Sequence, residues 1–236
     1  MKGNLVMISW EKLPEYMQVP EVRPYYDALS QRKAQIVLKR CFDIILASIL
    51  LACLAIPMIV IACWIRIDSE GPVLYRQERV TTCGRHFWIH KFRTMVSNAD
   101  KIGSSVTVSD DERITSAGKK LRQFRLDELP QLIDVLQGTM SFVGTRPEAA
   151  KYVLQYKPEY YATLLLPAGI TSETSIRFKD ESKLLAQTDN VDRTYVEKIL
   201  PAKMKMNLES IIKFNLYTDV VTMVRTVLTV LGKEYC

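Results

Sequence analysis

Two adjacent carboxylates, Asp127 and Glu128, stand in the stretch RLDELPQL at residues 125–132. Acidic residues in the first turn of a helix complement its dipole, and an aspartate can cap its free amides, so a helix start alone would explain the pair. Carboxylates can also hold a divalent cation or attack an electrophilic phosphorus atom. The residues around the pair decide between these two interpretations.

Cationic and polar side chains gather around the two acids. Arg122 lies five residues before Asp127, Lys119 lies about one helical turn before Arg122, and Gln131 and Arg146 follow. Cations beside acids at a helix start make a place where a phosphate and a divalent ion can meet. Mg²⁺ typically takes one or two carboxylates together with substrate phosphate oxygens. The cationic and polar residues around the two acids therefore favour phosphate chemistry over a simple helix cap.

The two histidines do not predict a metal site. His86 and His90 are spaced i, i+4 in HFWIHKFR, but the segment lacks the glutamate of HExxH and alternates as a strand does. The preceding VLYRQERV also alternates, and TTCGR between them can turn the chain. We therefore predict a β-hairpin with surface histidines.

An uncharged apolar run of 22 residues, 44–65, predicts a membrane segment. Residues 24–43 and 66–85 each hold four Lys or Arg, so the flanks give no reason for the two ends to lie on opposite faces. Pro57 bends or breaks a helix at this point. A straight span is favoured by composition alone, whereas a segment that re-enters the same leaflet explains both observations.

The composition of the chain predicts one globular domain of ordinary size with a hydrophobic core. The chain has 236 residues, 48% of them hydrophobic, a net charge of +6, and five cysteines without CxxC spacing, which suits a reducing compartment. We expect helices at 117–126, from about Pro130 to Gly138, at 147–166 and, as one amphipathic helix, at 202–231. The predicted fold class is α/β, mainly α with a small β-hairpin.

Three long motifs, in order and spacing, resemble the bacterial sugar transferases known as monotopic phosphoglycosyl transferases. They are KRCFDIILASILLACLAIPMIVIACWIRIDSEGPVLYRQERV, HKFRTM and RQFRLDELPQLIDVLQGTMSFVGTRPE. The resemblance covers about residues 39–180. It implies transfer of a phospho-sugar from a UDP-sugar to a polyprenyl (undecaprenyl) phosphate, with release of UMP, at the cytoplasmic face of the bacterial inner membrane. It also implies a re-entrant apolar segment broken at Ile56 and Pro57.

The resemblance assigns roles to individual residues. It implies that Asp127 is the nucleophile of a phosphoaspartyl intermediate, that Glu128 holds Mg²⁺, and that Arg122 and Arg146 bind substrate phosphates. We add Gln131 to the phosphate-binding candidates because it follows the dyad.

Some positions depart from the family pattern. Thr145 stands where a proline usually precedes the arginine of the GPRP motif, and Ile56 stands where a serine usually precedes the membrane proline. GITSETSIRFK, 169–179, replaces a glycine-rich run, and Lys179 falls where the family has an arginine, so Lys179 joins the phosphate-binding candidates.

The predicted organisation has three parts. Residues 1–38 form an N-terminal interfacial extension, 39–67 the re-entrant membrane helix-break-helix, and 68–236 the compact cytoplasmic domain, with its amphipathic helix in the interface. Lys39 and Arg40 are predicted at the membrane surface.

The expected partners are a UDP-sugar, a polyprenyl phosphate and an anionic phospholipid bilayer, with no nucleic acid; the oligomeric state stays open, a homodimer being one option. Two rivals remain. One is a non-catalytic basic membrane adaptor, and the other is a transferase with a spanning anchor and direct single-step transfer. An adaptor has no use for a carboxylate pair ringed by arginines.

Overall fold

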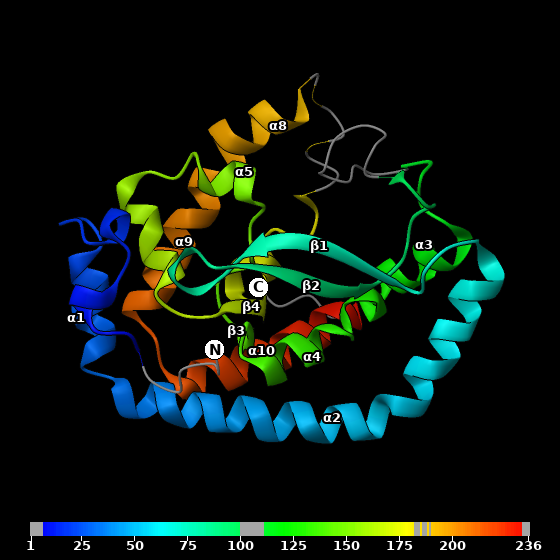
Figure 1. Ribbon diagram of the computed structural model, residues 1–236, viewed down its shortest axis with the longest axis horizontal. Helices are drawn as coiled ribbons and strands as arrows, with labels where there is room; N and C mark the ends of the chain where they lie inside the picture. The colour runs from blue at the N-terminus through cyan, green and yellow to red at the C-terminus, as the bar shows by residue number, and fades with distance from the viewer. Residues whose placement is uncertain (1–6, 100–110, 182–184, 186–187, 189, 233–236) are drawn as a thin grey trace.

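The apolar run lies in a single long helix, α2 (Lys33–Asp68), along one side of the domain (Figure 1). In the computed structural model, which describes residues 7–99, 111–181, 185, 188 and 190–232, α2 is the helix long and apolar enough to cross a membrane. The structure does not show the predicted break at Ile56 and Pro57. Instead, α2 continues through Pro57 as one bent helix. A proline removes one backbone hydrogen bond and leaves those of the neighbouring turns in place.

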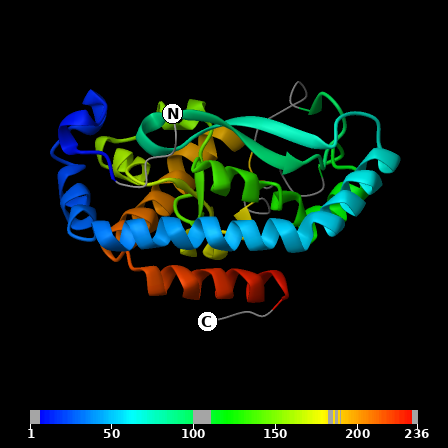
Figure 2. The same ribbon diagram turned by 60° about the horizontal axis from the view of Figure 1, so that its bottom comes forward.

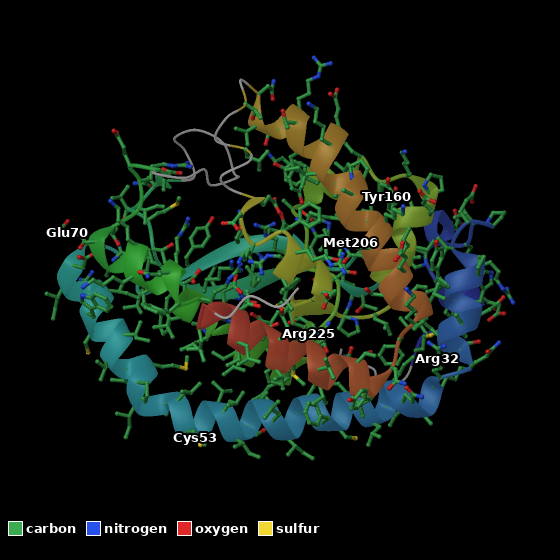
Figure 3. The ribbon with its side chains drawn as sticks, turned by 180° about the vertical axis from the view of Figure 1, so that it is seen from behind. Arg32, Cys53, Glu70, Tyr160, Met206 and Arg225 are labelled. Atoms are coloured by element: carbon green, nitrogen blue, oxygen red, sulfur yellow. The ribbon has the colours of Figure 1, made fainter. Side chains whose placement is uncertain are left out.

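Both ends of α2 attach to the same domain. Arg32, just before the helix, donates hydrogen bonds to the carbonyls of Ile212 (2.8 Å) and Phe214 (2.7 Å). At the other end, Asp68 accepts one from the amide of Ala117 at 3.1 Å. Figure 3 shows Arg32 and Glu70 at the two ends of the bent helix, with Cys53 between them. The bend therefore brings both ends of the apolar helix back to the domain.

Lys39 and Arg40 make contacts within the protein. Lys39 is only 7% exposed, and its Nζ lies 2.6 Å from a carboxylate oxygen of Asp219. Arg40 donates hydrogen bonds to the carbonyls of Val135 (2.6 Å) and Leu136 (3.0 Å). The membrane-surface role of both residues stays a prediction, but sequence patterning did not reveal the buried partner of Lys39 on a distant helix.

The predicted hairpin is confirmed. Strands β1 (Leu74–Val80) and β2 (His86–Phe92) pair antiparallel, from Leu74 opposite Phe92 to Val80 opposite His86. The 3₁₀ turn η3 (Thr82–Gly84) joins them. Buried Phe87 and Ile89 of β2 pack in one hydrophobic cluster with residues of α2 and α4 (Gln131–Gln137).

A second, parallel pair of strands was not predicted. Strands β3 (Met140–Val143) and β4 (Ala168–Thr171) have four residues each, too few to show a clear alternation. The predicted helix at 147–166 is two short pieces, α5 (Ala150–Val153) and η6 (Pro158–Leu164), because Pro158 begins a new turn. The fold is thus mainly helical with two small sheets, which confirms the coarse fold class.

The C-terminal region contains two helices where one was predicted. Helices α9 (Leu200–Ile212) and α10 (Leu216–Val230) are separated at Asn215, whose side chain accepts from the amide of Tyr217 at 2.8 Å and caps α10. Helix α9 buries Met204 and Leu208 in the main core. Helix α10 instead lies beside α2 (Figure 2) and leaves Val224 54% exposed.

The N-terminal segment belongs to the core. It forms η1 (Trp10–Lys12), η2 (Glu15–Met17) and α1 (Arg23–Ser30). Buried residues of this segment pack with α9 and η6 in the largest hydrophobic cluster. The predicted boundary at 38/39 falls inside α2, which already begins at Lys33. An interfacial role for residues 1–38 stays a prediction.

The other helical elements are short and surround the hairpin. They are α3 (Ser116–Gln123), η5 (Leu126–Glu128), α6 (Glu173–Arg177), α8 (Val191–Thr194) and the π-helical η7 (Tyr195–Ile199).

Lys39→Met tests the attachment of α10 to α2. Removing the ammonium leaves the carboxylate of Asp219 buried without its partner, so we expect a loss of about 3–5 kcal/mol in the free energy of unfolding. Replacing both partners, Lys39→Met with Asp219→Leu, should cost less than the single change. Denaturant unfolding in detergent measures the effect, with Arg193→Met, which removes an exposed ion pair with Glu197, as the control. A single variant as stable as the control would contradict the account.

Candidate active site

The two acids lie on a short 3₁₀ turn between α3 and α4. Arg125 has a left-handed backbone (φ 54°, ψ 23°), which ends α3 and starts η5 with Asp127 and Glu128. The following helix α4 has Pro130 as its N-cap and no side-chain capping bond. Neither acid therefore caps α4 through its side chain.

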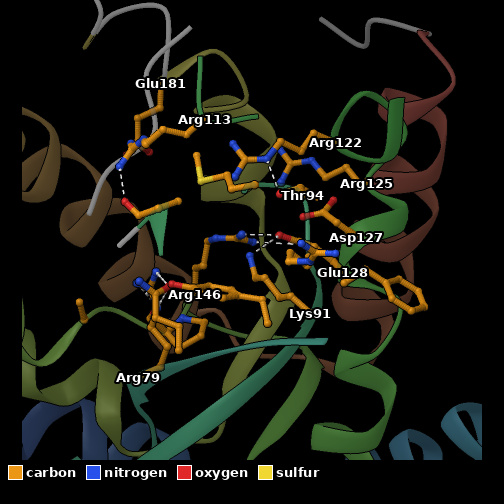
Figure 4. Close-up of a pocket in the computed structure, with 18 of the residues that line it drawn as sticks. Arg79, Lys91, Thr94, Arg113, Arg122, Arg125, Asp127, Glu128, Arg146 and Glu181 are labelled. Carbon is orange, nitrogen blue, oxygen red and sulfur yellow. Dashed lines mark hydrogen bonds and ion pairs between the residues drawn. The ribbon is translucent and has the colours of Figure 1, made fainter. Parts of the chain in front are cut away.

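Glu128 is held by two cations from different parts of the fold. Lys91 Nζ from β2 lies 3.2 Å from Glu128 Oε1, and Arg146 contacts both carboxylate oxygens, with its Nη1 3.4 Å from Oε2. Figure 4 shows Glu128 facing Lys91 and Arg146. This arrangement joins β2, η5 and the segment after β3 at one carboxylate.

Asp127 has a different environment. Its side chain is 9% exposed, lines a cavity, and makes no hydrogen bond or ion pair with any of the described residues. A buried carboxylate without a partner is costly unless it serves a ligand or a reaction. Asp127 therefore has its oxygens available to whatever enters the cavity.

The two acids titrate in opposite directions. Burial raises the pKa of Asp127, and the adjacent charge of Glu128 raises it further, although Lys91, Arg122 and Arg146 oppose both effects. Burial alone would also raise the pKa of Glu128, but Arg146 and Lys91 hold that pKa well below its ordinary value. The two cations thus favour the ionised form of Glu128, whereas burial and the adjacent charge disfavour ionisation of Asp127.

The cavity beside the dyad is strongly cationic. It has a volume of about 610 Å³, enough for a nucleotide-sized ligand. An excess of arginine and lysine over acids, in a partly enclosed space, favours an anion with more than one phosphate group. The cationic lining residues are Arg79, Lys91, Arg93, Arg113, Arg122, Arg125, Arg146, Lys179 and Lys203.

Three of the predicted phosphate-binding residues line this cavity: Arg122, Arg146 and Lys179. The Nε of Arg122 donates to Thr94 Oγ1 at 2.9 Å, which leaves the terminal nitrogens of its guanidinium for a ligand. Gln131 does not line the cavity; it is buried at the start of α4, and its amide has no hydrogen-bond partner. Gln131 is therefore close to the dyad in sequence but lies outside the cavity.

Sequence reasoning missed Lys91, Thr94, Arg79 and Arg125 as cavity residues. Lys91 and Thr94 stand in HKFRTM, one of the motifs that carried the resemblance, so the signal was present for those two. Their proximity to Glu128 and Arg122 depends on how the hairpin packs against η5, which no local pattern encodes.

Close backbone contacts set the positions of Arg122 and Arg146. A Cβ on Gly118 of α3 would lie 2.1 Å from the carbonyl oxygen of Thr94, so only glycine lets α3 approach the end of β2. On the other side, the amide of Gly144 donates to Thr171 (3.0 Å) and the amide of Gly169 donates to Thr145 (2.9 Å). These bonds to β4 fix the backbone that carries Arg146.

The far end of the cavity holds a second polar network. Tyr195 donates to Glu148 Oε1 at 2.6 Å, and Lys203 Nζ donates to Tyr195 (3.1 Å) and to Glu181 Oε2 (3.1 Å). Glu148, Tyr195 and Lys203 are buried and line the same cavity as the dyad. These groups can bind hydroxyl or amide groups of a ligand whose phosphates lie near Asp127.

The prediction of surface histidines on the hairpin is confirmed for His86 and was wrong for His90. His90 is buried, with its backbone amide 2.9 Å and its Nδ1 2.7 Å from the two carboxylate oxygens of Asp134, which ties β2 to α4. His86 pairs with Glu78 on the exposed side of the hairpin. Within the described part of the chain, no group of three His, Cys, Asp or Glu side chains is placed to hold a metal.

The dyad nevertheless suits a magnesium ion that arrives with a substrate. Mg²⁺ needs only one or two protein carboxylates when phosphates and water complete its shell. A carboxylate has about four lone-pair sites, so Glu128 keeps acceptor capacity beyond its contacts with Lys91 and Arg146. The donor set is thus compatible with one hard cation.

Comparison with known proteins gives the family. The bacterial sugar transferase family matches residues 34–233, most of the chain. The chain therefore belongs to the bacterial sugar transferase family.

Three similar proteins have names that state an activity. The chain is 32% identical over 82% of its length to the UDP-N-acetylgalactosamine-undecaprenyl-phosphate N-acetylgalactosaminephosphotransferase of Aeromonas hydrophila. It is 34% identical over 90% of its length to the UDP-glucose:undecaprenyl-phosphate glucose-1-phosphate transferase of Escherichia coli (strain K12), and it covers 44% of each of these two proteins. A protein of Caulobacter vibrioides, also named UDP-glucose:undecaprenyl-phosphate glucose-1-phosphate transferase, is 32% identical over 83% of the chain and 70% of its own length. The chain thus spans less than half the length of the first two relatives.

Arg146→Met tests the ion pair at Glu128. Because the pKa of Glu128 is lower in the folded chain than in the unfolded one, this carboxylate stabilises the fold fully above its ordinary pKa and loses that contribution as the pH falls toward the folded value. We expect the variant to lose about 1–3 kcal/mol near neutral pH. The difference from the wild type should shrink below about pH 4.

Unfolding free energies measured across the acid range check this expectation. The matched control is Arg177→Met, which removes an exposed arginine near Glu173. A loss in Arg146→Met that does not change with pH would mean that Arg146 contributes only packing.

Proposed function

We propose that this chain transfers a sugar 1-phosphate from a UDP-sugar to a polyprenyl phosphate such as undecaprenyl phosphate, releases UMP, and so starts the synthesis of a surface glycan. The observation that carries the proposal is the free Asp127 carboxylate beside the ion-paired Glu128 in a cationic cavity. The names of the three relatives support both substrates.

In the first step, an Asp127 oxygen attacks the phosphorus that bears the sugar. An Asp127 oxygen–phosphorus bond forms, and the bond from that phosphorus to the oxygen bridging the two phosphates breaks. UMP leaves with the bridging oxygen and its electron pair. The covalent intermediate lets UMP leave before the bulky lipid arrives.

In the second step, a phosphate oxygen of the polyprenyl phosphate attacks the same phosphorus. The bond between Asp127 and phosphorus breaks, the carboxylate is restored, and the product is a polyprenyl diphosphate sugar. Charge develops on the phosphate oxygens in both steps. Arg122 and Arg146 line the cavity where they can bind those oxygens through forked hydrogen bonds.

Glu128 is the residue proposed to hold Mg²⁺, which, when bound, would neutralise charge on the phosphates. Arg146 and Lys91 keep Glu128 ionised and fixed in place. Lys179 lines the cavity and is proposed to contact a donor phosphate.

We further propose that α2 dips into one leaflet of the bacterial inner membrane and returns, with the catalytic domain on the cytoplasmic face. Both ends of α2 bind the domain, and its apolar surface near the bend is open, with Ile56 75% exposed. Helix α10 adds an exposed apolar face beside α2, formed by Val220, Val224 and Val227. Together the two helices fit insertion into an anionic phospholipid bilayer.

The two alternatives make different demands on the site. A non-catalytic adaptor needs basic charge but gains nothing from a buried, unpaired Asp127. A transferase with a spanning anchor and direct transfer needs the ends of α2 on opposite faces of the bilayer. The test of the proposed function is UMP release by purified protein in detergent with Mg²⁺ and polyprenyl phosphate, across a panel of UDP-sugars. Release with no member of the panel would contradict it.

Asp127→Asn and Glu128→Gln should fail in different ways. The first variant keeps the shape of the side chain but removes the attacking anion, so UMP release should fall on the order of 10³-fold or more. The second should raise the Mg²⁺ concentration needed for half-maximal rate, with part of the rate restored by excess Mg²⁺. Steady-state UMP assays over a Mg²⁺ series measure both, and thermal unfolding confirms that each variant folds. A fully active Asp127→Asn enzyme would rule out the covalent route.

Cysteine labelling of α2 tests its topology. In right-side-out vesicles, single cysteines at Lys33 and Glu70 should both resist a membrane-impermeant maleimide and react after the vesicles are opened. Both positions flank the ends of a helix whose two ends attach to one domain. Labelling of either position from outside would support a spanning anchor.

A further inference from the structure

Arg125 is a cation in the active-site cavity without a protein partner. It lines the cavity next to the dyad, and its guanidinium makes no hydrogen bond or ion pair with any residue that the structure describes. The neighbouring cations differ in this respect. Arg146 and Lys91 bind Glu128, Arg122 binds Thr94, and Arg93 binds backbone carbonyls after α2.

The backbone at Arg125 is in an uncommon conformation. Its φ of 54° lies in the left-handed region, which a non-glycine residue adopts at a cost. An asparagine or glycine would fit this position more easily, so the local turn does not by itself require an arginine. Arg125 contributes its guanidinium side chain to the cavity wall.

Apolar residues precede and follow Arg125 in the chain. Leu126, the next residue, packs against a hydrophobic cluster that also receives Met58 and Ile61 from the second half of α2. Phe124, the preceding residue, is 49% exposed. Figure 4 shows Arg125 and Arg122 together beside Asp127, with Arg79 on the far side of Arg146.

The two proposed substrates differ in solubility and therefore in the side from which they enter the cavity. A nucleotide sugar is water-soluble and carries polar groups that suit the far network of Glu148, Tyr195 and Lys203. A polyprenyl phosphate keeps its chain in the bilayer, so its phosphate must enter from the α2 side. Arg125 has no hydrogen-bond or ion-pair partner among the described residues, and it lies between the exposed Phe124 and Leu126, which packs in a cluster with residues of α2. This setting matches a phosphate attached to an apolar chain.

We propose that Arg125 binds the phosphate of the lipid acceptor and places its attacking oxygen toward the phosphorus held on Asp127. This inference rests on the proposed function and adds a residue to it. Arg125 acts in the second half-reaction, after UMP has left. Formation of the phospho-sugar intermediate does not need it.

The test separates the two half-reactions in Arg125→Gln. UMP released by enzyme and UDP-sugar without acceptor reports the first half-reaction, and its amplitude and rate should match the wild type within about twofold, since no interaction of that step is lost. The KM for polyprenyl phosphate in the complete reaction should rise roughly tenfold, the usual scale for one charge-assisted contact. Arg125→Lys, which keeps the charge and loses the fork, should lie between the two.

A second variant guards against a folding defect. Arg125→Gly removes the guanidinium while the backbone keeps its positive φ without strain, so it should give the same rise in acceptor KM as Arg125→Gln. Arg193→Gln is the matched control, because Arg193 is an exposed arginine on α8 outside the cavity and its loss should leave the KM unchanged.

A reduced UMP burst with an unchanged acceptor KM would overturn the inference and place Arg125 on the donor. Unchanged values for both would also overturn it. Absence of UMP release in the wild type with every UDP-sugar is a separate result, since it contradicts the proposed function before Arg125 is tested.

Discussion

The ion pairs at Glu128 are the interaction on which the site depends. Two adjacent carboxylates in a buried position repel each other, and each is destabilised by the loss of water. Arg146 and Lys91 compensate one of them, so that Glu128 is ionised and fixed. Asp127 keeps its oxygens free in the cavity, with Arg122 and Arg125 beside it. Glu128 is fixed by ion pairs and Asp127 is not, so two similar side chains can take different roles.

The rest of the fold positions the partners of that carboxylate. The hairpin delivers Lys91, the left-handed turn at Arg125 presents the dyad, and the parallel strands fix the segment of Arg146. Glycines at the two closest backbone contacts, Gly118 and Gly169, allow these pieces to meet. Below this assembly, α2 and α10 leave apolar surface open on one side of the molecule. This arrangement supports the proposal that a soluble donor and a lipid acceptor reach one aspartate from different directions.

Much of this could be predicted from local sequence. Alternation identified the hairpin, and Pro130 and Gly138 marked the ends of α4, where the glycine has a φ of 79°. The apolar run identified α2, and the acids with Arg122 and Arg146 proved to line one cavity. The cap at Asn215 was a readable signal for the start of α10 that the single-helix prediction overlooked.

Other features depend on contacts between distant segments. In the sequence, Lys39 has the setting of a membrane-surface residue. Only the structure shows that it pairs with Asp219, 180 positions away. The four-residue strands β3 and β4 exist because their backbones pair, and neither has a distinctive pattern. Gln131 follows the dyad in sequence, but the start of α4 turns it into the interior. Arg125 becomes noticeable only when its neighbours are seen to have partners and it has none among the described residues.

The central claim is that Asp127 carries the phospho-sugar, and intact-mass spectrometry of the protein tests it most directly. Protein incubated with its UDP-sugar and Mg²⁺, without a lipid acceptor, should gain the mass of one sugar phosphate. Peptide mapping should place that adduct on Asp127, and addition of polyprenyl phosphate should remove it. An adduct on another residue, or turnover with no adduct under any trapping condition, would contradict the account.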